Sequence, residues 1–276
     1  MGLTTGVGPF SSSPTGALNF TVAPATGSAL IWWPVPQRIR AIVGGETVVD
    51  SRQAKLLHET GHLPVYYFPR EETRVDLLEP SDHETFCPHK GRASYWTIAA
   101  GERTVHDAMW EYREPLDAAS FLTGHVALYW NRVDEWFAED ELLLGHPRDP
   151  FHRIDVHPTS RHVRVLLDGE VLAESVRARG LFETALPPRW YLPAEDVQAD
   201  LLEASATKTR CAYKGSASYW SVRVGDRFED DLVWSYLEPE HDAEQVRGLL
   251  CFFNERVDLE LDGEPVERPR TQWSRD

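Results

Sequence analysis

An internal repeat is the feature that most constrains this chain. Glu72–Trp96 reads ETRVDLLEPSDHETFCPHKGRASYW, and Asp196–Trp220 reads DVQADLLEASATKTRCAYKGSASYW, at an offset of 124 residues. The same offset relates Arg132 to Arg256 without a gap, and about 37 of roughly 100 aligned positions are identical. Solenoid repeats are shorter, typically about 20–50 residues, so a period of this length indicates a duplicated domain.

The repeat sets the expected boundaries within the 276 residues. Residues 1–37 are rich in Gly, Ser, Thr, Pro and Ala, which is typical of an extended arm. Ile31, Trp32 and Trp33 are apolar, and we expect them to dock on a domain. The expected parts are an arm at 1–37, a first repeat domain at 38–137, a connector at 138–161, a second repeat domain at 162–261 and a tail at 262–276.

Sequence patterns within each repeat favour strands. Apolar and polar residues alternate at 38–43, and the segments 65–68 and 93–98 are rich in β-branched and aromatic residues. Short helices are expected at 69–72 and 115–122, where proline and acidic residues suit a first helical turn. The predicted fold is mainly β: two tandem small antiparallel domains with minor helices, related as a pseudo-twofold duplication.

Charge restricts the partners. Asp and Glu number 44 against 28 Lys and Arg, a formal net charge of −16, and no block of basic residues occurs. Binding to nucleic acid or to an anionic membrane depends on neutralising phosphates, so both partners are excluded. No apolar run approaches the roughly 20 residues of a membrane-spanning helix. A small molecule is the expected partner, with a homo-oligomer left open.

Cysteine usage indicates a reducing compartment. The three cysteines are odd in number and form no C-x-x-C pair, which excludes a disulfide framework and a Cys-rich zinc site. The chain has no Lys or Arg before Arg38, so its beginning does not read as a secretory signal. We therefore expect a cytoplasmic protein.

A Cys-x-x-Lys-Gly motif recurs in both repeats. It reads CPHKG at 87–91 and CAYKG at 211–215. The thiol would act as a nucleophile, the lysine would lower its pKa or bind an anion, and the glycine would let backbone approach a ligand. The alternative is a buried cysteine beside a turn, with lysine in solvent. The candidate catalytic residues are Cys87, Lys90, Cys211 and Lys214, together with Glu59 and Glu183, which would act as general bases, ligand anchors or simple turn residues.

Aromatic and arginine side chains supply the candidate ligand contacts. Most rings should fill the cores of the small sheets, but neighbours on a strand face opposite ways, so some should line a cleft. The arginines on the first strand of each repeat would contact the ligand or form structural ion pairs. The candidate substrate-binding residues are Arg40, Tyr67, His89, Tyr95, Trp96, Trp110 and Tyr112 in the first repeat, and Arg164, Tyr191, Tyr213, Tyr219, Trp220, Trp234 and Tyr236 in the second.

The connector is rich in histidine. His146, His152, His157 and His162 invite a metal hypothesis, but their spacings of six, five and five match no usual ligand pattern, so no metal site is predicted. Dinucleotide, Walker, nucleophile-elbow and H-E-x-x-H motifs are all absent, and no cofactor is expected.

The runs DLLEPSD, CPHKGRASYW and W-x-Y-x-x-P, with CAYKGSASYW and WSYLEP in the second copy, resemble a bacterial family catalogued as domain of unknown function 427. The connector is similar to that of two-copy actinobacterial members. The resemblance implies a compact β domain of the Mss4-like or β-tent kind. Many β-tent relatives hold zinc through paired cysteines that this chain lacks. The positions matching the family pattern are Glu59, Tyr67, Cys87, Lys90, Gly91, Tyr95, Trp96, Trp110 and Tyr112, with their counterparts 124 residues later.

Three functions follow from these patterns. The first is binding of a small organic molecule in an aromatic-lined pocket, with cofactor-independent catalysis by Glu, Lys and Cys if the protein is an enzyme. The second, suggested by the family's nucleotidyltransferase-like label, is a metal-dependent nucleotide transferase. The third is a non-catalytic interaction module that uses sheet edges or the Trp32–Trp33 segment. His89 beside Cys87 makes the first repeat richer in titratable groups.

Overall fold

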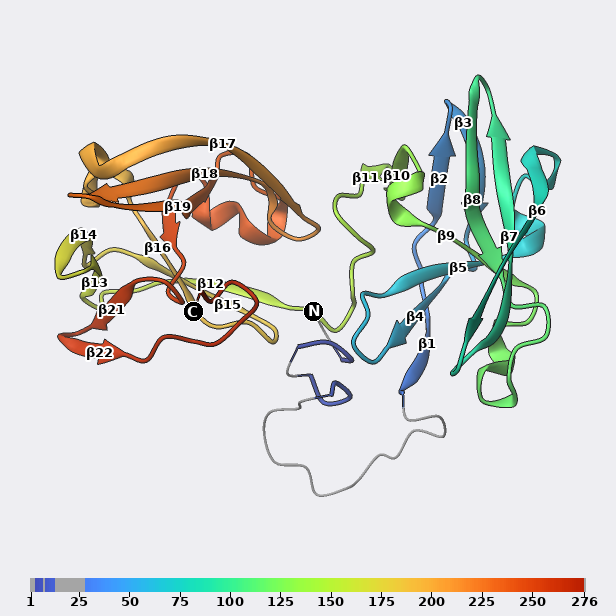
Figure 1. The fold of residues 1–276 in the computed structure, drawn as a ribbon, viewed down its shortest axis with the longest axis horizontal. Coiled ribbons are helices and arrows are strands. Elements are labelled where there is room, and N and C mark those ends of the chain that lie inside the picture. Colours follow the sequence, from blue (N-terminus) through green and yellow to red (C-terminus); the bar gives the residue numbers. More distant parts are fainter. Residues whose placement is uncertain (1–2, 7, 13–27, 276) are drawn as a thin grey trace. The chain divides into compact units, whose positions relative to one another are not determined.

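A computed structural model describes residues 3–6, 8–12 and 28–275. The chain divides into two compact units, Met1–Phe151 and His152–Asp276 (Figure 1). Among the described residues, no helix has the length and apolar character that crossing a bilayer requires.

The first domain consists of two antiparallel sheets. Its strands are β1 (Leu30–Pro34), β2 (Ile39–Val43), β3 (Glu46–Ser51), β4 (Lys55–Glu59), β5 (Val65–Pro69), β6 (Leu78–Cys87), β7 (Gly91–Ala100), β8 (Arg103–Glu111), β9 (His125–Leu128), β10 (Glu135–Ala138) and β11 (Glu141–Leu142). The seven-stranded sheet has the order β1-β4-β5-β9-β8-β7-β6, and the four-stranded sheet has the order β11-β10-β2-β3.

The second domain repeats this plan. Its strands are β12 (Ile154–Pro158), β13 (Val163–Leu167), β14 (Glu170–Ser175), β15 (Arg179–Glu183), β16 (Arg189–Leu192), β17 (Leu202–Cys211), β18 (Gly215–Val224), β19 (Arg227–Tyr236), β20 (Leu250–Phe252), β21 (Asp258–Leu261) and β22 (Glu264–Val266). The seven-stranded order β12-β15-β16-β20-β19-β18-β17 matches that of the first domain position by position. The predicted fold class, mainly β with two tandem antiparallel domains, is confirmed.

Both domains begin earlier than the expected boundaries at 38 and 162. Strand β1 pairs with β4, so Trp32 lies opposite Leu57, and the expected docking of this segment takes the form of an edge strand. Strand β12 pairs with β15 in the same way. The composition of these two segments predicted an arm and a connector rather than strands. Edge strands tolerate proline and polar residues, so such a composition does not reveal them.

The short helices form where they were expected, but as 3₁₀ turns. Each follows a proline or a leucine with extended backbone and ends within two turns. The helical elements are η1 (Arg70–Glu72), η2 (Val75–Leu77), η3 (Asp117–Leu122), η4 (Trp130–Arg132), η5 (Ala194–Asp196), η6 (Ala199–Leu201) and η7 (His241–Val246).

The seven-stranded sheet of the first domain buries both faces. One face packs against the four-stranded sheet, so that Phe68 and Ile98 join Ile39 in one apolar cluster. The other face carries Tyr67 and is covered by Leu122 of η3. Because side chains alternate along a strand, this second face is the one that presents a row of tyrosines to a pocket.

Candidate ligand-binding site

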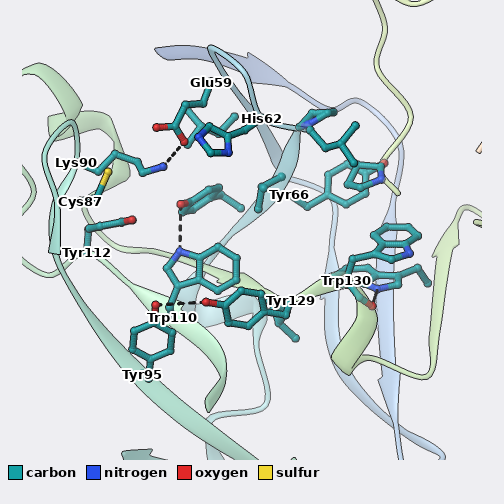
Figure 2. Close-up of a pocket in the computed structure, with 18 residues that line it drawn as sticks. Glu59, His62, Tyr66, Cys87, Lys90, Tyr95, Trp110, Tyr112, Tyr129 and Trp130 are labelled. Atoms are coloured by element: carbon teal, nitrogen blue, oxygen red, sulfur yellow. Dashed lines mark hydrogen bonds and ion pairs between the residues drawn. The ribbon is translucent and has the colours of Figure 1, made fainter. Parts of the chain in front are cut away.

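The first domain contains a pocket of about 450 Å³ near the β4–β5 connection and the end of β9 (Figure 2). Tyrosine and tryptophan rings form much of its wall, and charged groups gather at one end. Its lining residues are Leu57, Glu59, His62, Leu63, Pro64, Val65, Tyr66, Tyr67, Cys87, Lys90, Tyr95, Trp110, Tyr112, Leu128, Tyr129, Trp130, Trp136 and Pro147.

A lysine–glutamate ion pair lies at the polar end. Glu59 is the last residue of β4, and Lys90 lies in the turn between β6 and β7. The Lys90 Nζ donates a hydrogen bond to Oε2 of Glu59, and the two side chains are only 12% and 11% exposed. Nζ also lies 6.0 Å from the ring centre of Tyr112. The structure therefore brings together two residues that the sequence singled out, as partners of each other.

Gly91, which follows this lysine, is required by the chain's own packing. It has a φ of +105°, and a Cβ at this position would lie 3.3 Å from the Leu116 nitrogen and 3.4 Å from the Glu114 oxygen. The Leu116 N–H in turn donates to the Lys90 carbonyl at 3.0 Å. The glycine thus admits a neighbouring backbone segment rather than a ligand, which corrects the expectation drawn from the motif.

Hydroxyl and indole groups hold the aromatic wall in place. Trp110 Nε1 donates to the Tyr67 hydroxyl at 3.3 Å, and the hydroxyls of Tyr95 and Tyr129 are 3.3 Å apart. Burial raises the pKa of Tyr67 and Tyr112 well above 10, so both phenols stay protonated near neutral pH. In the described part of the chain, the Tyr112 hydroxyl makes no hydrogen bond. It is therefore available to a ligand.

Cys87 and His62 complete the polar end (Figure 2). Cys87 is half-buried, lines the pocket and begins the turn in which the Lys90 N–H donates to its carbonyl at 3.3 Å. His62 lies in the β4–β5 connection, where its N–H donates to the Glu59 carbonyl at 3.0 Å. A thiol, an imidazole, an ammonium and a carboxylate thus share one end of an otherwise apolar pocket.

Several pocket residues were not anticipated from the sequence. His62, Val65, Tyr129, Trp130 and Trp136 all line the pocket. Their counterparts in the second repeat are Leu186, Arg189, Phe253, Asn254 and Glu260. Apart from His89 and Tyr213, the sequence candidates are residues that recur in both copies, whereas these five pocket residues differ between the copies.

Other candidates lie outside the pocket. Trp96 faces the space between the two sheets, with the Arg70 guanidinium 4.5 Å from its ring centre. Trp220 packs against the corresponding core of the second domain. Neither shares a face with the row of tyrosines, because each neighbours a tyrosine that takes the opposite face.

Arg40 and Arg164 form surface ion pairs, which was the structural alternative. Arg40 contacts Asp140 at 2.9 Å, and Arg164 contacts Glu260 at 2.6 Å. Both lie on the four-stranded sheets, away from the row of tyrosines. His89 is half-buried and is not among the pocket residues, although it precedes Lys90.

The second domain contains the same ion pair in a more buried setting. Lys214 donates to Oε2 of Glu183, and His152 Nε2 lies 3.0 Å from Oε1 of the same carboxylate. The His152 ring lies 4.0 Å from the ring centre of Tyr213. Burial opposes the ionisation of Glu183, but the hydrogen bonds from His152 and Lys214 outweigh it and hold its pKa at about 2.

Arg189 fills the aromatic part of the second site. It occupies the position of Val65 and donates to both carboxylate oxygens of Glu255 at 2.7 Å. Its guanidinium lies 5.5 Å from the ring centre of Trp234, 5.8 Å from Phe253 and 5.6 Å from Trp273. The equivalents of Tyr67, Tyr95 and Tyr112 are Tyr191, Tyr219 and Tyr236. They pack in one apolar cluster with Trp234, whose indole N–H donates to the Tyr191 hydroxyl at 3.0 Å.

The family known as a domain of unknown function, DUF427, matches the chain twice, at residues 32–139 and 155–263. The chain belongs to the DUF427 family. No curated protein matches it significantly. The two matches begin within or beside β1 and β12, which agrees with the early start of each DUF427 domain in the structure.

The connector histidines of this tandem DUF427 protein have separate partners. His146 Nδ1 lies 2.7 Å from the Pro147 carbonyl oxygen, His162 Nε2 lies 2.7 Å from a carboxylate oxygen of Glu174, and His157 packs on Phe182. With His152 on Glu183, each ring is placed by a local contact.

The first DUF427 domain has a buried histidine that makes its stability depend on pH. His58 is 1% exposed, and its Nδ1 lies 3.7 Å from an Asp149 oxygen. Burial lowers the pKa of His58 below 6.5, with Asp149 partly opposing the shift. The unfolded chain therefore binds the extra proton more readily, and this contribution to stability is present above about pH 6.5 and is lost as the pH falls.

Replacing His58 with phenylalanine, the residue at the equivalent position 182, tests this expectation. We expect the free energy of unfolding of the first domain to fall less steeply from pH 7.5 to pH 5.5 in H58F than in the wild type. Denaturant unfolding followed by hydrogen exchange at β4 and β5 measures it. Equal pH slopes in both proteins would contradict it.

Proposed function

We propose that the first DUF427 domain binds a small organic molecule containing a flat ring. The observation that supports this is a 450 Å³ pocket whose aromatic walls lead to a buried Lys90–Glu59 pair. Ligand pockets typically have volumes of about 300–1,000 Å³ and combine apolar walls with a few placed polar groups. The second domain has the same ion pair, but Arg189 occupies the space between its rings.

The polar end would orient the ligand. One of the three N–H groups of the Lys90 ammonium donates a hydrogen bond to Glu59, which leaves two as donors, and the Tyr112 hydroxyl adds a third. A carbonyl or hydroxyl of the ligand would accept from them, while Trp110 and Tyr129 stack on its ring. If the site is catalytic, Glu59 would accept a proton and Cys87 would be the nucleophile.

The transferase alternative has less support from the donor set. Glu59 is the only carboxylate among the described residues that line the pocket, and it already binds Lys90. Sites that hold magnesium for phosphoryl transfer usually use at least one or two carboxylates with open coordination positions. A metal-dependent thermal shift with a nucleoside triphosphate would restore this alternative.

A fragment screen by saturation-transfer NMR tests the proposal. The blocking variant is V65R/N131E, which copies the Arg189–Glu255 pair of the second domain into the first and leaves the net charge unchanged. We expect aromatic fragments to bind the wild type and to lose at least tenfold in affinity on V65R/N131E, because the guanidinium fills the space between the rings.

The single variant N131E is the matched control. It adds the exposed carboxylate without the guanidinium and should bind fragments as the wild type does. A library without hits, or hits that V65R/N131E leaves unaffected, would rule out this pocket as the binding site.

A further inference from the structure

We infer that the ligand of the first domain carries a planar organic cation. This rests on the proposed function of that pocket and specifies its ligand class. The duplication provides the reason: the second domain holds, at the equivalent place, a planar cation of its own. Arg189 supplies it from the position where the first domain has Val65.

The walls around the Arg189 guanidinium correspond to walls of the first pocket. Three of its contacts in the second domain belong to the repeat: the rings of Trp234 and Phe253, and the side-chain oxygen of Asn254, which accepts from Nη1. At an offset of 124 these three become Trp110, Tyr129 and Trp130, all of which line the first pocket. The third ring, Trp273, lies in the C-terminal tail, and the first domain has Asp149 at the same offset. Val65 ends at its methyl groups, so the space that the guanidinium fills is left to a ligand.

The first pocket is more aromatic than its counterpart. Trp130 replaces Asn254, and it stacks on Trp136 with ring centres 4.9 Å apart and planes within 5°. Trp110 and Tyr129 also pack together, at 4.6 Å. Indole faces attract cations more strongly than other side-chain rings, and planar cations of the guanidinium type stack on them.

Charges around the site favour a cation over an anion. Among the described residues that line the pocket, Lys90 carries the one ammonium group, and it is paired with Glu59, so this group offers an anion no unmatched charge. Arg132 stacks on Tyr129 at 4.7 Å, but its equivalent, Arg256, lies 5.8 Å from the Phe253 ring centre without displacing Arg189. The formal net charge of −16 also raises the local concentration of cations.

One difference sets the strength of binding. Glu255, which pairs with Arg189, corresponds to the exposed Asn131 in the first domain. The ligand's cation would therefore be held mainly by ring faces rather than by a carboxylate. Such a contact is weaker than a buried ion pair and suits a ligand that must exchange.

Three probes of one shape test the inference: benzamidinium, benzamide and benzoate, which carry positive, zero and negative charge. Titration of the full chain by NMR at pH 7 should show benzamidinium binding about tenfold more tightly than benzamide, with benzoate weakest. V65R/N131E should lose the benzamidinium site, and its unchanged net charge separates the pocket from general attraction to an acidic surface.

The outcomes separate this inference from the proposed function. If benzamide or benzoate binds as tightly as benzamidinium and V65R/N131E abolishes the binding, the inferred positive charge of the ligand is wrong, but the proposed binding pocket is retained. The inference of a cationic ligand is also contradicted if none of the three probes binds while the fragment library yields neutral or anionic hits whose binding V65R/N131E abolishes. If neither probes nor library show any binding that this variant removes, both proposals fail.

Discussion

Replacing Glu255 with alanine is expected to destabilise the second domain by about 3–5 kcal/mol. The side chains of Arg189 and Glu255 are 7% and 0% exposed, and two hydrogen bonds join them. Removing the carboxylate leaves a guanidinium among rings, where water cannot solvate it. Thr271, which donates to Glu255 at 2.7 Å, loses its acceptor as well.

The double variant R189M/E255L is the matched control. It replaces the pair with apolar side chains of similar size, and its stability should lie within about 1–2 kcal/mol of the wild type or above it. Hydrogen exchange at β16 and β19 during urea titration reports on this domain alone. If E255A lowers the unfolding free energy of the second domain no more than R189M/E255L does, then Glu255 is not needed to neutralise a buried charge on Arg189.

Acidification is expected to remove roughly 3 kcal/mol of stability from the second domain through Glu183. Its carboxyl has a pKa of about 2 in the folded chain, against about 4.5 for the unperturbed group. Because the folded pKa is depressed, the stabilisation is fully present above about pH 5. It is lost as the pH falls towards 2, where the carboxylate takes up a proton and its bonds to Lys214 and His152 weaken.

Comparison with E183Q isolates this carboxylate from all others that titrate in the same range. The variant will be less stable at pH 7, because Lys214 loses its counter-charge. The difference in unfolding free energy between wild type and E183Q should then shrink by roughly 3 kcal/mol between pH 5 and pH 2. A difference that does not change with pH would show that Glu183 does not ionise as described.

The duplicated sequence predicts the fold and those residues of the site that are identical in both repeats. Glu59, Cys87 and Lys90 were identified because identical residues recur 124 positions later, and β strands follow from local alternation. The pairing of Lys90 with Glu59 was not predictable, because it joins residues 31 positions apart through the order of strands in the sheet.

The missed part of the site has a common cause. Val65 and Arg189 occupy the same position of the repeat, and this position decides whether the site is open or filled. Because the two residues differ, a search for identical residues in the two copies does not find them. The importance of Arg189 appears only beside Glu255, 66 residues away. The edge strands β1 and β12 were missed because pairing with a neighbouring strand, rather than their own composition, makes them strands.

The matched indoles of Trp110 and Trp234 give this protein an internal reference for spectroscopy. Each N–H donates to the tyrosine hydroxyl at the same place in its own domain, so changes in temperature, salt or solvent should move both resonances together. Occupancy of the open pocket should move only that of Trp110, since Arg189 already covers Trp234. A single spectrum of the intact chain thus contains both the resonance that reports binding, from Trp110, and a reference resonance, from Trp234.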